Sequence, residues 1–255
     1  MTPMRILFLG NNWVGWQVAR WLKEQGEEIV GLILPPLPNR KYGEEIISTA
    51  GLNPANLFEG SQLDSPGTMD AIRYLRAEIA LSVLFDEILQ LDFIGLFPRG
   101  VINLHPAYLP YNRGLYPNVW SIVEGTPGGV TLHYVDSGVD TGGIISQQQV
   151  PVEPVDTGET LYRKLERACV DLLIATWPLI RSGRARCRPQ QEEGTYHRRR
   201  DVERIDEIDP NQTYTARELI DIIRARTFPP YPGAYLKQDG GRIYLRLQLL
   251  REKEL

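Results

Sequence analysis

The chain has 255 residues, 42% of them hydrophobic and 24% charged, so it can bury a substantial core as one large domain or one domain with an appendage. Its formal net charge of −4 argues against a general affinity for nucleic acid, which needs clustered Lys and Arg. Cys169 and Cys187 are too few for a disulfide framework or a zinc site, and no apolar run reaches the roughly 18 residues of a membrane span. We therefore expect a cytoplasmic protein that binds neither nucleic acid nor membranes and holds no metal.

Short apolar runs alternate with helical patterns over residues 1–183, which predicts an α/β domain with a mainly parallel sheet flanked by helices. The predicted strands are 6–9, 29–34, 79–84, 101–103, 130–134 and 144–150. The predicted helices are 14–23, 42–50, 69–75 and 117–124, followed by a long helix that opens at Asp156 and Glu159 with a capping-box pattern.

The turn formed by Gly10, Asn11, Asn12 and Trp13 follows the first strand and opens a helix, as a nucleotide-binding turn does. It is not the dinucleotide motif, which needs glycine at position 12. Two interpretations stay open: the turn binds a phosphate or a sugar hydroxyl, or it simply needs its glycines.

The chemistry is expected at the ends of two strands. Asn103 and His105 are two residues apart, so in a strand over 101–105 they project from the same side. Asp140 lies in a glycine-bracketed turn, where positive φ and close approach to the backbone are possible. His133, in the middle of a strand, is interpreted as structural or as part of a cleft wall.

The polar segment 184–255 is predicted to form a C-terminal extension. A second capping-box pattern at Thr215 and Glu218 opens a short helix. A hairpin follows, with a strand over 234–237, a turn over 239–241, and a second strand in which Ile243, Leu245, Leu247 and Leu249 alternate with polar residues. A lone hairpin is marginal in water, so we expect it to pack on the domain or to form a homodimer. His197, in a run of arginines, is expected on a solvated surface.

Taken together, an ordered set of motifs resembles the folate-dependent formyltransferases, which include methionyl-tRNA formyltransferase, glycinamide ribonucleotide transformylase and the sugar-nucleotide N-formyltransferases. The motifs are residues 103–110, Arg113-Gly114, Pro117, Trp120, residues 129–133 and residues 139–142. Residues 111–120 look closest to the small sugar-nucleotide N-formyltransferases. The tail resembles the start of the tRNA enzyme's C-terminal barrel but is expected to be truncated relative to it.

The resemblance implies a Rossmann-like formyltransferase domain that uses 10-formyltetrahydrofolate as co-substrate. It implies that Asn103, His105 and Asp140 are catalytic. The expected folate-binding residues are Phe85, Glu87, Ile88, Leu89, Gly138 and Val139. The expected acceptor-binding residues are Gly10, Asn11, Asn12, Trp13, Tyr108 and Arg113.

The expected acceptor is a nucleotide-linked amino sugar, of the 4-amino-4,6-dideoxy type. Three alternatives stay open at this point: a methionyl-tRNA formyltransferase-like enzyme, a formyltetrahydrofolate hydrolase, and a non-catalytic folate- or nucleotide-binding module. The last of these would not require Asn103, His105 and Asp140 together.

Overall fold

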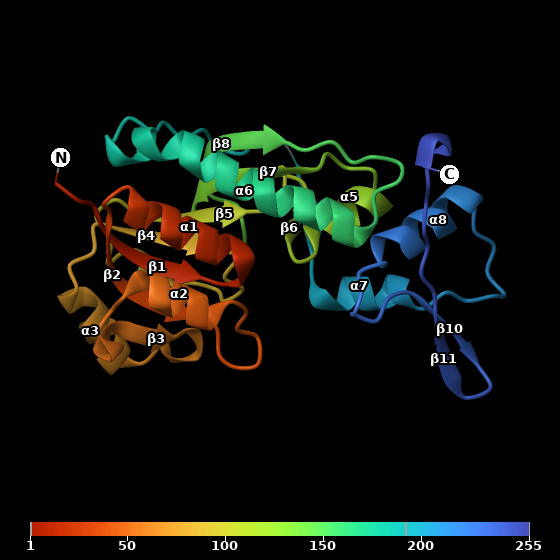
Figure 1. The fold of residues 1–255 in the computed structure, drawn as a ribbon, viewed down its shortest axis with the longest axis horizontal. Helices are drawn as coiled ribbons and strands as arrows, with labels where there is room; N and C mark the ends of the chain where they lie inside the picture. Colours follow the sequence, from red (N-terminus) through yellow and green to blue (C-terminus); the bar gives the residue numbers. More distant parts are fainter. Residues whose placement is uncertain (1, 192, 255) are drawn as a thin grey trace. The chain divides into compact units, whose positions relative to one another are not determined.

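The computed structural model describes residues 2–191 and 193–254. Within these residues, seven strands form the central sheet in the order β3-β2-β1-β4-β5-β7-β8 (Figure 1). The pairs β1–β2, β2–β3, β1–β4 and β4–β5 are parallel, and β5–β7 is antiparallel, so the predicted mainly parallel α/β fold is confirmed. The strands are β1 (Arg5–Gly10), β2 (Glu28–Leu34), β3 (Leu57–Glu59), β4 (Ile79–Val83), β5 (Val101–His105), β7 (Gly129–Tyr134) and β8 (Ile144–Gln149).

The central strands are buried along almost their whole length. All five residues of β4 and five of the six residues of β1 are buried. Strands covered on both faces read as continuous apolar runs, which is why the sequence pattern found them. Because β1, β4 and β5 are parallel neighbours, their carboxyl ends share one edge of the sheet, where ligands of open α/β sheets bind.

The helices of the chain follow the predicted order, with two short additions that no periodicity signalled, α4 and α7. No helix within residues 2–191 and 193–254 is long and apolar enough to cross a membrane. The helices are α1 (Asn12–Glu24), α2 (Gly43–Ala50), α3 (Pro66–Tyr74), α4 (Leu91–Ile94), α5 (Pro117–Val123), α6 (Gly158–Arg181), α7 (Arg199–Asp206) and α8 (Ala216–Ala225), and the 3₁₀ turns are η1 (Pro54–Asn56), η2 (Gly60–Gln62) and η3 (Glu252–Glu254).

One predicted helix cap is confirmed and one is wrong. Thr215 and Glu218 form the expected capping box of α8. At α6, the reciprocal bonds are made one residue later than predicted: Thr160 N donates to Thr157 Oγ1 over 3.2 Å, and Thr157 N donates to Thr160 Oγ1 over 2.9 Å. Asp156 is drawn instead into a buried ionic cluster.

By its internal contacts the chain divides into two compact units. The first comprises Met1–His105, Thr131–Gln147 and Cys169–Gln191, and the second comprises Pro106–Val130, Gln148–Ala168 and Glu192–Leu255. The first unit contains β1 to β5. In the second unit, the short strands β6 (Arg113–Gly114) and β9 (Tyr196–His197) pair in parallel, and α5 packs against α8.

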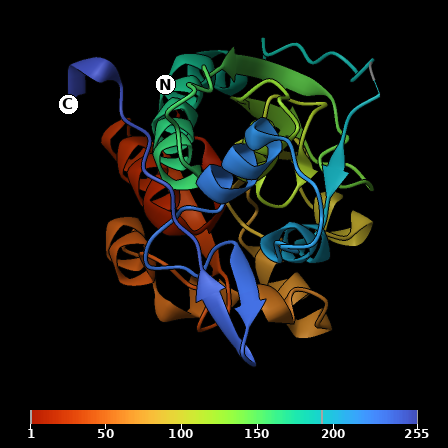
Figure 2. The ribbon, with the colours of Figure 1, turned by 90° about the vertical axis from the view of Figure 1, so that its right-hand side faces the viewer.

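The C-terminal hairpin of the second unit is formed by β10 (Tyr235–Gln238) and β11 (Gly241–Tyr244) (Figure 2). Its two-residue turn has φ values of 50° and 78° at Asp239 and Gly240, the left-handed pair that a tight hairpin requires. The second strand is shorter than predicted. Regular pairing ends at Tyr244, and Leu247 N donates to Thr227 Oγ1 instead of to a strand partner.

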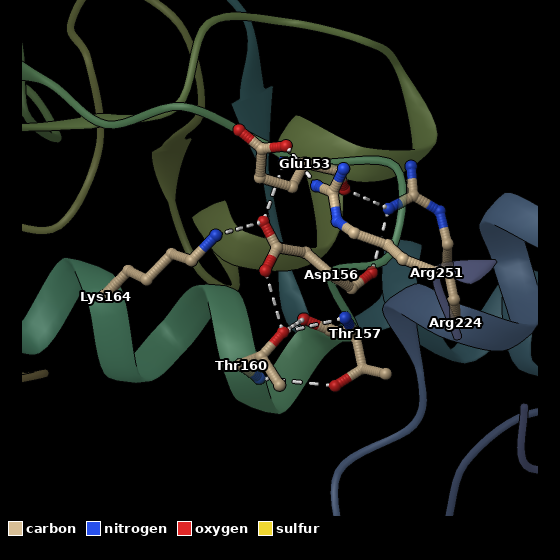
Figure 3. Close-up of polar contacts among 7 residues, drawn as sticks. All are labelled: Glu153, Asp156, Thr157, Thr160, Lys164, Arg224 and Arg251. Carbon is tan, nitrogen blue, oxygen red and sulfur yellow. Dashed lines mark hydrogen bonds and ion pairs between the residues drawn. The ribbon is translucent and has the colours of Figure 1, made fainter. Parts of the chain in front are cut away.

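The second unit also contains the Asp156 cluster, formed by Glu153, Asp156, Thr157, Thr160, Lys164, Arg224 and Arg251 (Figure 3). The Asp156 carboxylate is 4% exposed and accepts from Glu153 N at 2.7 Å, Thr160 Oγ1 at 2.9 Å and Lys164 Nζ at 2.8 Å. Arg224 Nη1 donates to the carbonyl oxygens of Asp156 and Glu153 at 2.8 Å and 3.2 Å. The cluster thus joins the start of α6 to α8 and to the C-terminal segment.

Candidate active site

Strand β5 presents Asn103 and His105 on one side, as their spacing predicted. In the antiparallel register with β7, Asn103 lies opposite His133 and His105 lies opposite Thr131. The strand ends at His105, directly before Pro106, which cannot donate to a ladder. The two side chains therefore stand at the carboxyl edge of the sheet.

The turn that carries Asp140 has a backbone conformation that few residue types can adopt, and hydrogen bonds from Asp136 stabilise it. Asp140 has φ 54°, in the left-handed region that Asp tolerates better than most residues. A Cβ on Gly142 would run into the carbonyl oxygen of Tyr134, so glycine is required there. The Asp136 carboxylate braces the turn, accepting from Gly138 N at 3.0 Å and Thr141 Oγ1 at 2.6 Å.

The structure brings Asn103, His105 and Asp140 together. Asn103 Nδ2 donates to Asp140 Oδ1 over 3.2 Å, and His105 Nε2 lies 3.6 Å from Asp140 Oδ2. The side chains of His105 and Asp140 are 9% and 11% exposed, so the carboxylate acts on its neighbours in partly dehydrated surroundings. An amide donor, an imidazole and a carboxylate in this arrangement can stabilise an oxyanion and move a proton.

His133, interpreted from the sequence as structural or as part of a cleft wall, lies beside Asn103 and Asp140. Its Nδ1 lies 2.8 Å from the carbonyl oxygen of Tyr134, so Nδ1 carries the proton and Nε2 is free to accept. Nε2 lies 3.2 Å from Asn103 Nδ2 and 3.4 Å from Asp140 Oδ1. His133 and Asp140 thereby orient the Asn103 amide.

The expected folate-binding residues lie after β4 and within the 138–142 turn, both in the first unit. Phe85 and Leu89 are buried in the hydrophobic core, whereas Ile88 is 71% exposed. Burying these two side chains anchors the 85–89 loop and leaves Ile88 outside the core. Gly138 N is committed to Asp136. The binding roles of Phe85, Glu87, Ile88, Leu89, Gly138 and Val139 stay predictions.

The turn after β1 is hydrogen-bonded to the 39–41 loop. Asn11 is 7% exposed, and its side chain donates to Asn39 O and accepts from Lys41 N. The backbone N–H of Asn12 donates to Lys41 O, and that of Trp13 donates to Asn12 Oδ1. These groups fix the 39–41 loop beside the turn. The expected acceptor-binding role of residues Gly10 to Trp13 stays a prediction.

The other expected acceptor-binding residues, Tyr108 and Arg113, belong to the second unit. Arg113 opens β6, and its N–H donates to Thr195 O over 3.0 Å. Asn112 beside it is fully buried, and its Nδ2 donates to Ser121 Oγ at 3.0 Å and Thr126 Oγ1 at 2.8 Å. The loop that carries Arg113 is therefore fixed to α5 and to the segment around Thr195.

His197 is buried, and the expectation of a solvated surface was wrong. It is 8% exposed, because its ring stacks on Trp120 with centroids 4.0 Å apart and an interplanar angle of 10°. Its Nε2 lies 3.3 Å from Glu124 Oε2. His197 belongs to β9, and the pairing of β9 with β6 accompanies its burial although the following residues, 198–200, are arginines.

Comparison with known proteins finds formyltransferases. Methionyl-tRNA formyltransferase of Geobacter sulfurreducens is 25% identical over 251 residues, covering 96% of this chain and 78% of the relative. The dTDP-4-amino-4,6-dideoxyglucose formyltransferase of Mycobacterium bovis is 30% identical over 176 residues, covering 66% of this chain and 75% of the relative.

Two solved structures are similar as well. A candidate sugar N-formyltransferase from Mycobacterium tuberculosis superposes with a TM-score of 0.82 at 23% identity, covering 99% of this chain and 100% of that one. A formyltransferase from Anoxybacillus kamchatkensis, solved with UDP-4,6-dideoxy-4-formamido-L-AltNAc and tetrahydrofolate, is 31% identical with a TM-score of 0.58, covering 78% of this chain and 88% of that one.

Family models account for most of the chain. Residues 201–251 match the N-formyltransferase dimerization C-terminal domain. Residues 9–176, which include Asn103, His105 and Asp140, match the formyl transferase model. The chain therefore belongs to the formyl transferase family, enzymes of one-carbon group transfer.

Proposed function

We propose that this enzyme moves the formyl group of 10-formyltetrahydrofolate to the amine of a nucleotide-linked amino sugar of the 4-amino-4,6-dideoxy type. One observation carries the proposal: Asn103, His105 and Asp140 are assembled in a chain whose C-terminal segment matches the N-formyltransferase dimerization domain. The names of the Mycobacterium bovis and Anoxybacillus kamchatkensis relatives support this acceptor and this folate co-substrate.

The chemistry follows from the residue types in the site. The amine attacks the formyl carbon, a new C–N bond forms, and the tetrahedral intermediate carries an oxyanion and an ammonium proton. Asn103 donates an N–H to the oxyanion, while His105 handles the proton that is released by the amine and needed by the departing folate nitrogen. Asp140 orients His105 and stabilises its protonated form.

Both substrates are assigned to loops that the family resemblance picked out. The backbone of Glu87 and Leu89 binds the pteridine ring, with Ile88 as an apolar wall, and Phe85, Gly138 and Val139 complete that site. For the nucleotide-linked sugar, the resemblance supports a binding role for the Gly10–Trp13 turn in the first unit and, separately, for Tyr108 and Arg113 in the second. A diphosphate needs only a few donors, which suits a chain of net charge −4.

The acceptor is tested by a screen of nucleoside-diphosphate-linked amino sugars with 10-formyltetrahydrofolate, read out by mass spectrometry of the formamide product. We expect one 4-amino-4,6-dideoxy sugar to be formylated, at ordinary salt sensitivity, and methionyl-tRNA to stay unmodified. The matched blank is the Asp140→Asn variant in the same mixture.

Methionyl-tRNA is the second candidate acceptor, because the Geobacter sulfurreducens relative aligns over 96% of this chain. If methionyl-tRNA is formylated efficiently and no amino sugar reacts, the proposal that the acceptor is an amino sugar is refuted. Release of formate without any amine would indicate a hydrolase. Binding of both ligands without turnover would indicate a non-catalytic module.

We further propose that residues 1–183 are the catalytic part, that residues 184–255 are an extension serving assembly, and that the enzyme works in the cytoplasm. The extent of the two family matches, 9–176 and 201–251, supports this division. The extension carries exposed apolar side chains on the hairpin, Ile243 at 47% and Tyr244 at 48% exposure. Such a surface on a two-stranded unit suits a homodimer.

The dimer hypothesis predicts that Ile243→Glu shifts the molecular mass in solution from dimer to monomer at micromolar concentration, because a charge placed in an apolar contact is costly to desolvate. Analytical ultracentrifugation measures the mass. Tyr74→Ser, which removes an 83% exposed ring outside the extension, serves as the control and should leave the dimer intact. A monomeric wild-type protein would refute the hypothesis.

A further inference from the structure

The segment after α6 lies along the first residues of β8. Arg188 and Ile144 form an antiparallel bridge, with N to O distances of 2.9 Å and 2.8 Å in the two directions. The Arg188 side chain adds a contact, from Nη2 to Gln147 Oε1, at 2.5 Å. All of these residues belong to the first unit. The bridge fixes the register, and so it determines where Gln190 lies.

Gln190 contacts the turn that carries Asp140. Its Nε2 donates to the carbonyl oxygen of Asp140 over 2.8 Å and to that of Gly142 over 2.9 Å. The primary amide has two N–H donors on one nitrogen, and the two carbonyls match them. Gln190 is half-buried and lies 50 residues from Asp140 along the chain. Its amide thus joins the two carbonyl groups on either side of Thr141.

The turn depends on such support. Asp140 has a positive φ, and the following Gly142 and Gly143 restrict the backbone little. Asp136 braces the turn through Gly138 N and the Thr141 hydroxyl, which are different groups from the carbonyls of Asp140 and Gly142. Gln190 holds both of them. Without it, the backbone on each side of Asp140 can rotate more freely.

We propose that Gln190 is a positioning residue for formyl transfer: it holds the 138–142 turn so that the Asp140 carboxylate stays in contact with Asn103 and His105. The inference rests on the proposed catalytic role of Asp140. In the two contacts that support this inference, Gln190 binds backbone carbonyl oxygens of the turn. Its effect should therefore fall on the rate of chemistry and not on binding of the amino sugar, because the residues proposed to bind that sugar lie outside the 138–142 turn.

The test compares Gln190→Ala with wild type in steady-state kinetics of formyl transfer. We expect kcat to fall about tenfold while KM for the amino sugar changes less than about twofold, since small misplacements of a catalytic group are costly in rate. Arg188→Ala is the control on the same segment. It removes only the side-chain contact to Gln147 and should keep kcat within about twofold.

A second variant adds a readout that general loss of structure would not produce. Gln190→Glu keeps the side-chain length but places a carboxylate against two carbonyl oxygens. Its kcat should fall further than that of Gln190→Ala at neutral pH, and it should recover partly at acidic pH, where a protonated carboxyl can donate one bond. An unchanged pH profile relative to wild type would count against the inference.

Hydrogen–deuterium exchange of the 136–143 peptide separates this inference from the assignment of the reaction. We expect faster exchange in Gln190→Ala than in wild type and in Arg188→Ala. If the wild type transfers no formyl group, the proposed function fails and the exchange data alone decide whether Gln190 holds the turn. If the wild type is active and Gln190→Ala matches it in kcat, the positioning role is refuted.

Discussion

Asp140→Asn is expected to lower kcat for formyl transfer by at least about a hundredfold, with thermal stability close to that of wild type. The variant removes the charge that stabilises protonated His105, and positioned acid–base groups contribute about 10²- to 10⁴-fold. Asn is the matched replacement because Asp140 has φ 54°, where Asn is tolerated and Ala adds backbone strain to the chemical loss. Steady-state kinetics and thermal denaturation, run side by side, measure both effects.

The same loss is expected for Asn103→Ala and His105→Ala, since an oxyanion donor is worth about 10²- to 10³-fold. The three losses should be far from additive when combined, because the side chains act as a unit. Near-normal turnover in any single variant, with the protein folded, would remove that residue from the mechanism. His133→Gln is an informative companion, because it perturbs the orientation of Asn103 without removing a member of the triad.

Asp156→Ala is expected to lower the free energy of unfolding by about 2 to 4 kcal/mol, through loss of the Asp156 cluster. The substitution leaves Lys164, the Thr160 hydroxyl and Glu153 N without their acceptor. The upper end of the usual range for a buried pair is not expected, because Lys164 is 40% exposed and can be hydrated. Urea denaturation followed by circular dichroism gives the value.

Two variants control this measurement. Asp171→Ala removes an exposed carboxylate from the same helix and should change stability by no more than about 0.5 kcal/mol. Asp156→Asn keeps the shape and one acceptor oxygen but loses the charge that pairs with Lys164, so its cost should be intermediate. A cost for Asp156→Ala as small as that for Asp171→Ala would show that the cluster contributes nothing to folding.

Much of the fold was predictable from local patterns. Buried parallel strands read as continuous apolar runs, and amphipathic helices repeat every three to four residues, so β1, β4 and α6 each carry their own signal. The spacing of Asn103 and His105 placed them on one side of β5. The glycines around Asp140 predicted a turn in which the backbone approaches other groups closely. Gly142, whose backbone lies against the Tyr134 carbonyl, confirms this. These features depend on residues close together in sequence.

What the sequence by itself determined is therefore the order of the elements and the position of Asn103, His105 and the Asp140 turn. The tertiary structure decided what surrounds them. His133 meets Asn103 through the antiparallel register of β5 and β7, Gln190 reaches the Asp140 turn through its bridge to β8, and His197 is buried by stacking on Trp120. Each contact joins segments whose pairing no local pattern encodes, because it depends on which strands become neighbours and in which register.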